Sequence, residues 1–140
     1  MISNSYANKI LNLICGVSDA LQLPSTMYLG LCSAEPNAST GAITGEPTAA
    51  SYERVPIGGS TNGLKKYFGS ASGGIISNAE EIKFNVARES FGTMNYFFLS
   101  ESASGNAILW GAITGGVTIN AETVPVFYEG DLKASIDVEI

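Results

Sequence analysis

The 140-residue sequence contains no histidine, only two cysteines and few charged residues, and these absences exclude several kinds of active site. Histidine is the usual base of Ser-His-Asp and Cys-His sites and the commonest metal ligand. We therefore expect no catalysis of that type and no resident metal or cofactor. Cys15 and Cys32 are too few for a disulfide scaffold. Because free cysteine behaves as a small apolar residue, we expect two free thiols that are buried or half-buried.

Positive charge is scarce as well. Seven Lys and Arg stand against thirteen Asp and Glu, which gives a formal net charge of −6. Contacts to a phosphate backbone depend on Lys and Arg, so nucleic acid is not an expected partner. Arg54 directly follows Glu53, and we expect a structural arginine in an exposed ion pair with this neighbour, which contributes little to stability.

Long apolar runs are missing, although 45% of the residues are hydrophobic and 16 are glycine. Without a run of about 18 apolar residues, we expect no membrane insertion. The first 16 residues lack the basic and long apolar regions of a signal peptide, so we expect folding in a cytosol. The length is typical of one domain. We predict a single domain over residues 1–140, with a helical segment at about 1–23 and a β-sandwich at about 24–140.

One helix is predicted at about residues 4–15. Tyr6, Ile10, Leu13 and Ile14 recur at the spacing i, i+4, i+7 and i+8, which places one apolar stripe along a helix. Gly16 supplies the left-handed residue that commonly ends a helix. Residues 17–23 leave open a further helical turn.

After Pro24 the hydrophobic period changes from 3.6 to 2, which indicates strands. Strands are predicted at residues 26–32, 52–57, 81–86, 92–100, 107–113, 124–128 and 132–140, and a long surface loop at 33–50. Gly30 marks a position where another group packs closely. We predict an all-β fold, mainly an antiparallel β-sandwich or barrel of jelly-roll-like form, with one N-terminal α-helix. The predicted core includes Phe84, Leu99, Trp110, Ile136 and Val138.

Two kinds of residue remain as candidates for chemistry or ligand binding. The carboxylates could supply a glycosidase pair, or a calcium site at Glu129 and Asp131, but they lie mostly at turns and on exposed strand faces. We therefore expect no enzyme. The aromatic residues Trp110, Tyr96, Phe97 and Phe98 could stack on a sugar, but their apolar strands favour a place in the core.

Several short segments along the chain resemble those of one known family. They are Ala7–Leu11 leading to Gly16, Tyr28–Leu31, Tyr52–Val55, Ile82–Phe84, Gly92-Thr93, Gly105–Ala112 and Gly130–Leu132. Together they resemble the small virion structural proteins, assigned as tail fibres, of tailed bacteriophages and prophages. The resemblance implies a virion component, a tail fibre or tail-associated protein made in the host bacterial cytoplasm, that self-assembles and docks onto the particle. Capsid decoration, as a head fibre, and a carbohydrate-binding module for a host-surface glycan are the alternatives.

The apolar stripe is the predicted assembly interface. Virion proteins are used in many copies, so we expect a homo-oligomer that also contacts other virion proteins of the tail or capsid. A short helix is marginal alone in water and needs a surface that covers its apolar face. We therefore place Tyr6, Ile10, Leu13 and Ile14 in the contact. In the alternative interpretation, the helix covers the open end of its own sandwich.

Overall fold

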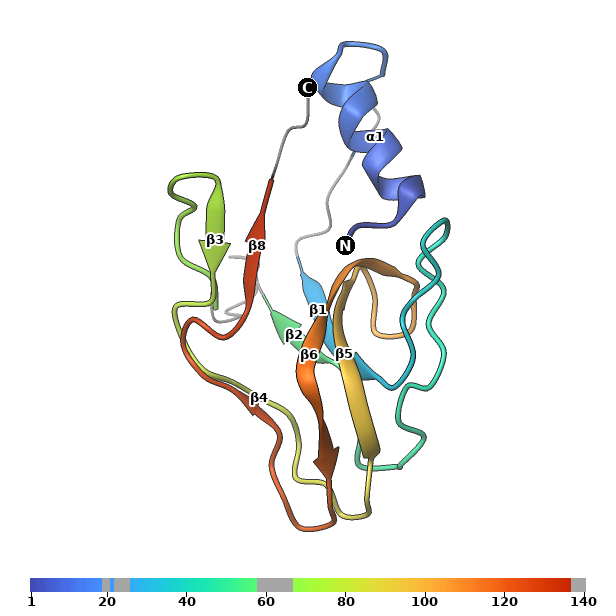
Figure 1. Ribbon diagram of the computed structural model, residues 1–140, viewed down its shortest axis with the longest axis vertical. Helices are drawn as coiled ribbons and strands as arrows, with labels where there is room; N and C mark the ends of the chain where they lie inside the picture. Colours follow the sequence, from blue (N-terminus) through green and yellow to red (C-terminus); the bar gives the residue numbers. More distant parts are fainter. Residues whose placement is uncertain (19–20, 22–25, 58–66, 137–140) are drawn as a thin grey trace.

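The computed structural model describes residues 1–18, 21, 26–57 and 67–136. Within these residues the chain forms one helix, α1 (Asn4–Ile14), and eight strands (Figure 1). The strands are β1 (Met27–Cys32), β2 (Val55–Ile57), β3 (Ile75–Ser77), β4 (Ile82–Lys83), β5 (Gly92–Ser100), β6 (Ala107–Ile119), β7 (Val126–Phe127) and β8 (Lys133–Ser135). Neighbouring strands run antiparallel. The predicted class, antiparallel β with an N-terminal helix, is confirmed.

The largest sheet has four strands in the order β2-β1-β5-β6. Its outer strands, β2 and β6, do not pair with each other in the described part of the chain, so the sheet is open and forms no barrel. Pro56 lies in β2, where the missing N–H of proline is tolerated because this strand is at an edge. The apolar β5 is central and pairs with both β1 and β6, as its composition predicts.

The remaining strands form a long, interrupted antiparallel ribbon. β3 pairs with β8, and β4 pairs with β7. Backbone hydrogen bonds continue the pairing beyond β4, from the Phe84 N–H to the Pro125 carbonyl (3.0 Å) and from the Ala87 N–H to the Thr123 carbonyl (2.8 Å). Figure 1 shows this ribbon running alongside the four-stranded sheet.

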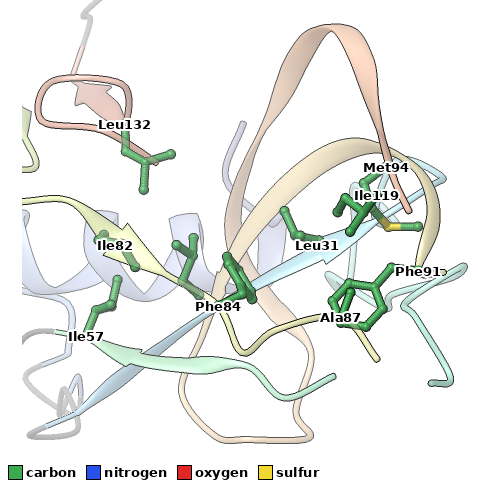
Figure 2. Close-up of a cluster of buried hydrophobic side chains, with 10 residues drawn as sticks. Leu31, Ile57, Ile82, Phe84, Ala87, Phe91, Met94, Ile119 and Leu132 are labelled. Atoms are coloured by element: carbon green, nitrogen blue, oxygen red, sulfur yellow. The ribbon is translucent and has the colours of Figure 1, made fainter. Parts of the chain in front are cut away.

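The main core lies between the sheet and the ribbon (Figure 2). Its buried side chains come from both layers: Leu29, Leu31, Ile57, Ile82, Phe84, Ala87, Phe91, Met94, Ile119 and Leu132. On the other face of the sheet, Phe98 and Trp110 form a second cluster with Cys32 and Ala107, and Ile43 of the 33–50 loop packs against it. The sheet is therefore covered on both faces near Phe98 and Trp110, and it packs on the ribbon in a sandwich-like arrangement.

Gly30 permits a close approach between β1 and β5. It pairs with Phe98, and a Cβ added at Gly30 would overlap the Phe98 ring. The guanidinium carbon of Arg54 lies 4.8 Å from the centre of the same ring. The ring therefore contacts both Gly30 and Arg54, which confirms the prediction of close packing at Gly30.

Replacing Gly30 with alanine is expected to lower the free energy of unfolding by about 1–3 kcal/mol, because the Phe98 ring has little room to move. Gly69 provides the control, since a Cβ there would lie 3.7 Å from the Ala79 Cβ, an ordinary contact. Gly69→Ala should change stability by no more than about 0.5 kcal/mol. Urea unfolding of both variants makes the comparison, and equal stabilities would contradict the packing argument.

The sequence-based prediction of β6 ended too early. Met94 pairs with Val117 and Tyr96 with Ala112, so residues 113–116 stand opposite the single residue Asn95. Gly115 and Gly116 have φ angles of +77° and +67°, a conformation that favours glycine. The two glycines indicate a turn in the sequence, but in the structure they belong to a bulge of four residues within β6.

Two further predictions need correction. Ile136 was expected in the core, but it is 84% exposed, because β8 ends at Ser135 and pairs, among the described strands, only with β3. The strand β3 was not predicted. Phe84 and Trp110 are buried as expected, and Leu99 packs partly buried against the core. Val138 lies outside the described residues.

Candidate functional site

The first turn of α1 is anchored on the body of the protein. Ile2 pairs with Leu109 of β6, and the Ser3 N–H donates to the Ile108 carbonyl (2.8 Å). The N–H groups of Asn4 and Ser5 then donate to the carbonyls of residues 38 and 39 in the 33–50 loop, at 2.9 and 3.1 Å. Free N–H groups at a helix start need acceptors, and here the loop supplies them in place of a capping side chain.

The predicted apolar stripe is covered at one end only. Tyr6 is buried at 6% exposure and Ile10 is half-buried, so the body of the protein covers these two residues. Leu13 and Ile14 are 41% and 73% exposed. At 3.6 residues per turn the four side chains fall within about 100° of the helix circumference. The stripe therefore continues from the protein interior into solvent.

The helix ends where Gly16 predicts. Gly16 has a φ of +72°, its N–H donates to the Leu13 carbonyl (3.3 Å), and the Val17 N–H donates to the Asn12 carbonyl (2.9 Å). These two bonds form a Schellman motif, which satisfies the carbonyls at the helix end. Every residue from Leu11 to Ser18 is exposed. The optional extension over 17–23 is not helical at residues 17, 18 and 21, and its other positions lie outside the described residues.

Two ionisable residues, Lys9 and Tyr6, lie at the covered end of the stripe. Lys9 is the single charged residue of α1, and its Nζ lies 5.4 Å from the centre of the Tyr6 ring. Burial, with the nearby Glu101 carboxylate as a smaller cause, raises the pKa of Tyr6 to about 12. The Tyr6 hydroxyl therefore stays protonated at neutral pH, and the covered end of the stripe is uncharged.

Arg54 forms a buried network that the sequence did not reveal. Its Nε and Nη2 donate to the two carboxylate oxygens of Glu46 at 2.7 and 2.8 Å, so the predicted exposed pair with Glu53 is wrong. Its Nη1 donates to the Ser100 hydroxyl (2.9 Å) and to the carbonyls of residues 102 and 105. Arg54 is only 8% exposed. The guanidinium therefore links three segments, which are the loop around Glu46, the residues before β2, and residues 100–105.

Tyr52 extends this network toward β1. Its hydroxyl donates to Glu46 (2.8 Å) and accepts the Leu31 N–H (3.1 Å). Burial is the largest cause that raises the pKa of Tyr52, so the hydroxyl remains a donor at neutral pH. The sequence offered no signal for this arrangement, because Glu46 lies in the 33–50 loop and not in a strand.

The other predicted binding residues are not gathered into an exposed site. Trp110 and Phe98 are buried, and Tyr96 and Phe97 are half-buried. The Asp131 carboxylate accepts the Tyr128 N–H (2.8 Å), which fixes the turn at residues 128–131. Among the described residues, no group of three or more Cys, Asp or Glu could hold a metal ion.

Comparison with known families decides the identity of the chain. The sequence matches the family model described as Podophage GP4 fiber I protein gp80 over residues 1–135. The chain belongs to this family. The match runs from α1 to the end of β8 and confirms the resemblance to phage fibre proteins. A search of curated proteins finds no match.

As a podophage fibre protein, the chain is a virion structural component. The described helix α1 has 11 residues, and no helix in the described parts is long and apolar enough to cross a membrane. A virion structural component contacts other proteins through exposed side chains, and the uncovered end of the stripe presents Leu13 and Ile14 in this way.

The two cysteines of this fibre protein are expected to react very differently. Both are free, but Cys15 is exposed, contrary to expectation, and Cys32 is buried. Cys32 donates to the Ala34 carbonyl (3.2 Å), and burial, with Glu46 as a smaller cause, raises its pKa to about 11. Because the thiolate is the reactive form, a disulfide reagent should label one thiol per native chain and two after denaturation.

Cys15→Ser provides the control. It should abolish the fast labelling of the exposed thiol and leave only the slow labelling of Cys32. Rapid labelling of both thiols in the native protein would contradict the burial of Cys32.

Proposed function

We propose that this podophage fibre protein self-assembles, and docks onto the tail of the particle, through the uncovered end of α1. The observation that carries the proposal is the exposure of Leu13 and Ile14 on a stripe whose other members are covered. Burial of each such side chain contributes about 1.5–3 kcal/mol to an interface. In this proposal, Tyr6 and Ile10 pack on the body of the protein and hold the helix in place.

The length of α1 supports this proposal. An isolated helix of 11 residues is marginal in water, and most helical stability in proteins comes from packing of an apolar face. The second half of α1 packs on little of its own chain, since residues 11–18 are exposed. A partner surface supplies the missing contact. We take residues 1–140 as a single domain that presents this helix, because the chain from Ile2 to Ser5 is hydrogen-bonded to the body.

The proposal is tested with the double variant Leu13→Ser/Ile14→Ser. Because both side chains are exposed, the subunit should stay folded, with an unchanged far-UV circular dichroism spectrum, while its mass by light scattering falls to that of a monomer. Ile75→Ser is the control, since Ile75 is another exposed isoleucine, on β3, at 50% exposure. It should leave the assembly intact.

Cys15 gives a second measurement, because it directly follows the helix and is exposed in the single chain. In the assembled protein its labelling rate should fall, and it should recover in the double variant. If the double variant assembles like the unaltered protein, the proposal is wrong, and the helix serves only its own subunit.

A further inference from the structure

Exposed apolar side chains gather on two separate surfaces. Ten large apolar residues are exposed among those that the structure describes, and seven of them lie on these surfaces. The first, called the helix tip, consists of Leu11, Leu13, Ile14 and Val17. The other three line an open groove and are Val117, Val124 and Tyr128.

This β6–β7 groove lies between the end of β6 and the segment 123–128, and its volume is about 440 Å³. Ile113 and Phe127 contribute further apolar lining. Its volume falls within the roughly 300–1,000 Å³ range of protein pockets that hold ligands, so it has room for several side chains. The bulge in β6 helps to form it, since Ile113 begins the bulge and Val117 is the first paired residue after it.

The helix tip of the same chain does not reach this groove. In Figure 1, α1 stands at one end of the long axis, and β6 ends toward the opposite end. The hydrogen bonds of Ser3, Asn4 and Ser5 hold the helix start in place. A helix tip that fills the groove must therefore come from another copy of the chain.

We propose that the β6–β7 groove of one copy receives the helix tip of a second copy. Charge complementarity supports this occupant, because Lys9 is the single charged residue of α1 and, among the described residues, Asp131 is the single charged one that lines the groove. The helix tip itself is uncharged, and the two surfaces together carry most of the large apolar side chains that are exposed among the described residues. This inference rests on the proposed self-assembly and names the surface that receives the helix.

Such a contact joins two different surfaces, so each pair of subunits still has one free helix tip and one free groove. Contacts of this heterologous kind repeat until they close into a ring or extend as a filament. A contact between two copies of α1 would instead be symmetric and would use no groove.

The test combines two variants that each lack one surface. Leu13→Ser/Ile14→Ser removes the helix tip, and Val124→Asp places a charge in the groove, where Val124 is 42% exposed. Each variant alone should be monomeric by light scattering. An equimolar mixture should give a heterodimer of twice the subunit mass that grows no further, because one partner supplies the groove and the other the tip.

The outcomes separate this inference from the proposed function. If the tip variant is monomeric while the Val124→Asp variant assembles normally, helix-mediated assembly stands and the groove is not its receptor. If both variants assemble normally, both proposals fail. A mixture that remains monomeric also overturns the groove contact. Should Val124→Asp fail to fold, Tyr128→Ser takes its place, since Tyr128 is 63% exposed.

A charge reversal provides an independent measurement. Lys9→Glu should weaken self-association about two- to five-fold through repulsion with Asp131, and added salt should reduce this difference. Lys9→Gln, which removes the charge without reversing it, should have a smaller effect. Equal association of the two variants at all salt concentrations would contradict the pairing of Lys9 with Asp131.

Discussion

Replacing Arg54 with alanine is expected to lower the free energy of unfolding by about 3–5 kcal/mol, the range typical of removing one partner of a buried ion pair. The side chain of Arg54 is 4% exposed and that of Glu46 is 26% exposed. Without the guanidinium, the half-buried Glu46 carboxylate keeps only the Tyr52 hydroxyl among the partners described above. The Ser100 hydroxyl also loses a donor.

The hydrogen bonds of Arg54 connect three segments that are not joined to one another by any strand pairing described above. Glu46 belongs to the 33–50 loop, Arg54 directly precedes β2, and the carbonyls of residues 102 and 105 belong to the loop between β5 and β6. Arg54→Lys should recover only part of the stability, because lysine cannot form the two parallel bonds to one carboxylate. Both variants can be compared by urea unfolding.

Two glutamates provide a matched control for this prediction. Glu46→Ala should be strongly destabilising, whereas Glu53→Ala, at the exposed neighbour of Arg54, should change stability by no more than about 0.5 kcal/mol. Equal effects of the two substitutions would contradict the assignment of Glu46 as the partner. The double variant Arg54→Ala/Glu46→Ala should cost less than the sum of the single changes, because each removes the same interaction.

Local patterns were sufficient to predict some elements. The spacing of apolar residues in α1 and the glycine at position 16 fixed a helix that the structure places at Asn4–Ile14. The run of apolar residues at 92–100 predicted β5 with its observed bounds and its central position. In both cases the information lies within one segment, because periodicity and composition act on neighbouring residues.

Other features depend on contacts between distant segments. Alternation shows that Leu132 and Ile136 share a face of a strand, but it does not show where the partner layer ends. Leu132 reaches the core at 3% exposure, whereas the Ile136 backbone N–H bonds to the Gly74 carbonyl (3.2 Å) at the end of the ribbon, and its side chain stays in solvent. The pairing of Arg54 with Glu46 is similar, since it depends on the path of a loop.

In the candidate site, too, some features follow from the local sequence and others depend on distant contacts. The helical period predicts which residues share the stripe, and the four predicted residues do lie along one face. The period does not predict that coverage ends after Ile10, because this depends on where β6 and the 33–50 loop meet the first turn of α1. The groove could not be predicted, since the bulge at Gly115 and Gly116 that borders it appears in the sequence as a turn.

Replacing Asn78 with alanine should lower the free energy of unfolding by about 3 kcal/mol or more. Asn78 is 1% exposed, and its Nδ2 donates to the carbonyls of Glu80 (2.8 Å) and Tyr128 (2.9 Å), while its Oδ1 accepts the Leu132 N–H (3.0 Å). Each hydrogen bond contributes about 0.5–1.5 kcal/mol, and a buried group left without a partner costs about 1–3 kcal/mol. Alanine removes all three bonds at once.

The position of Asn78 explains why these bonds matter. Its own N–H donates to the Leu132 carbonyl (3.1 Å), and its carbonyl accepts the Gly130 N–H (3.0 Å), so this one residue joins β3 to the turn that precedes β8. The ladder is interrupted between β4/β7 and β3/β8, and Asn78 fills that interruption. Loss of its side chain should therefore expose the Leu132 N–H to hydrogen exchange before the rest of the ribbon.

Asn85→Ala is the matched control, because Asn85 is exposed and close to β4 in the same ribbon. It should change the urea midpoint by an amount equivalent to no more than about 0.5 kcal/mol. Asn78→Asp should not rescue stability, since a carboxylate oxygen would face the carbonyls of Glu80 and Tyr128. If Asn78→Ala unfolded at the same urea concentration as the unaltered protein, the turn would be held by its backbone alone. Because Tyr128 borders the β6–β7 groove, the same variant should also assemble more weakly, and this loss should exceed that of Asn85→Ala.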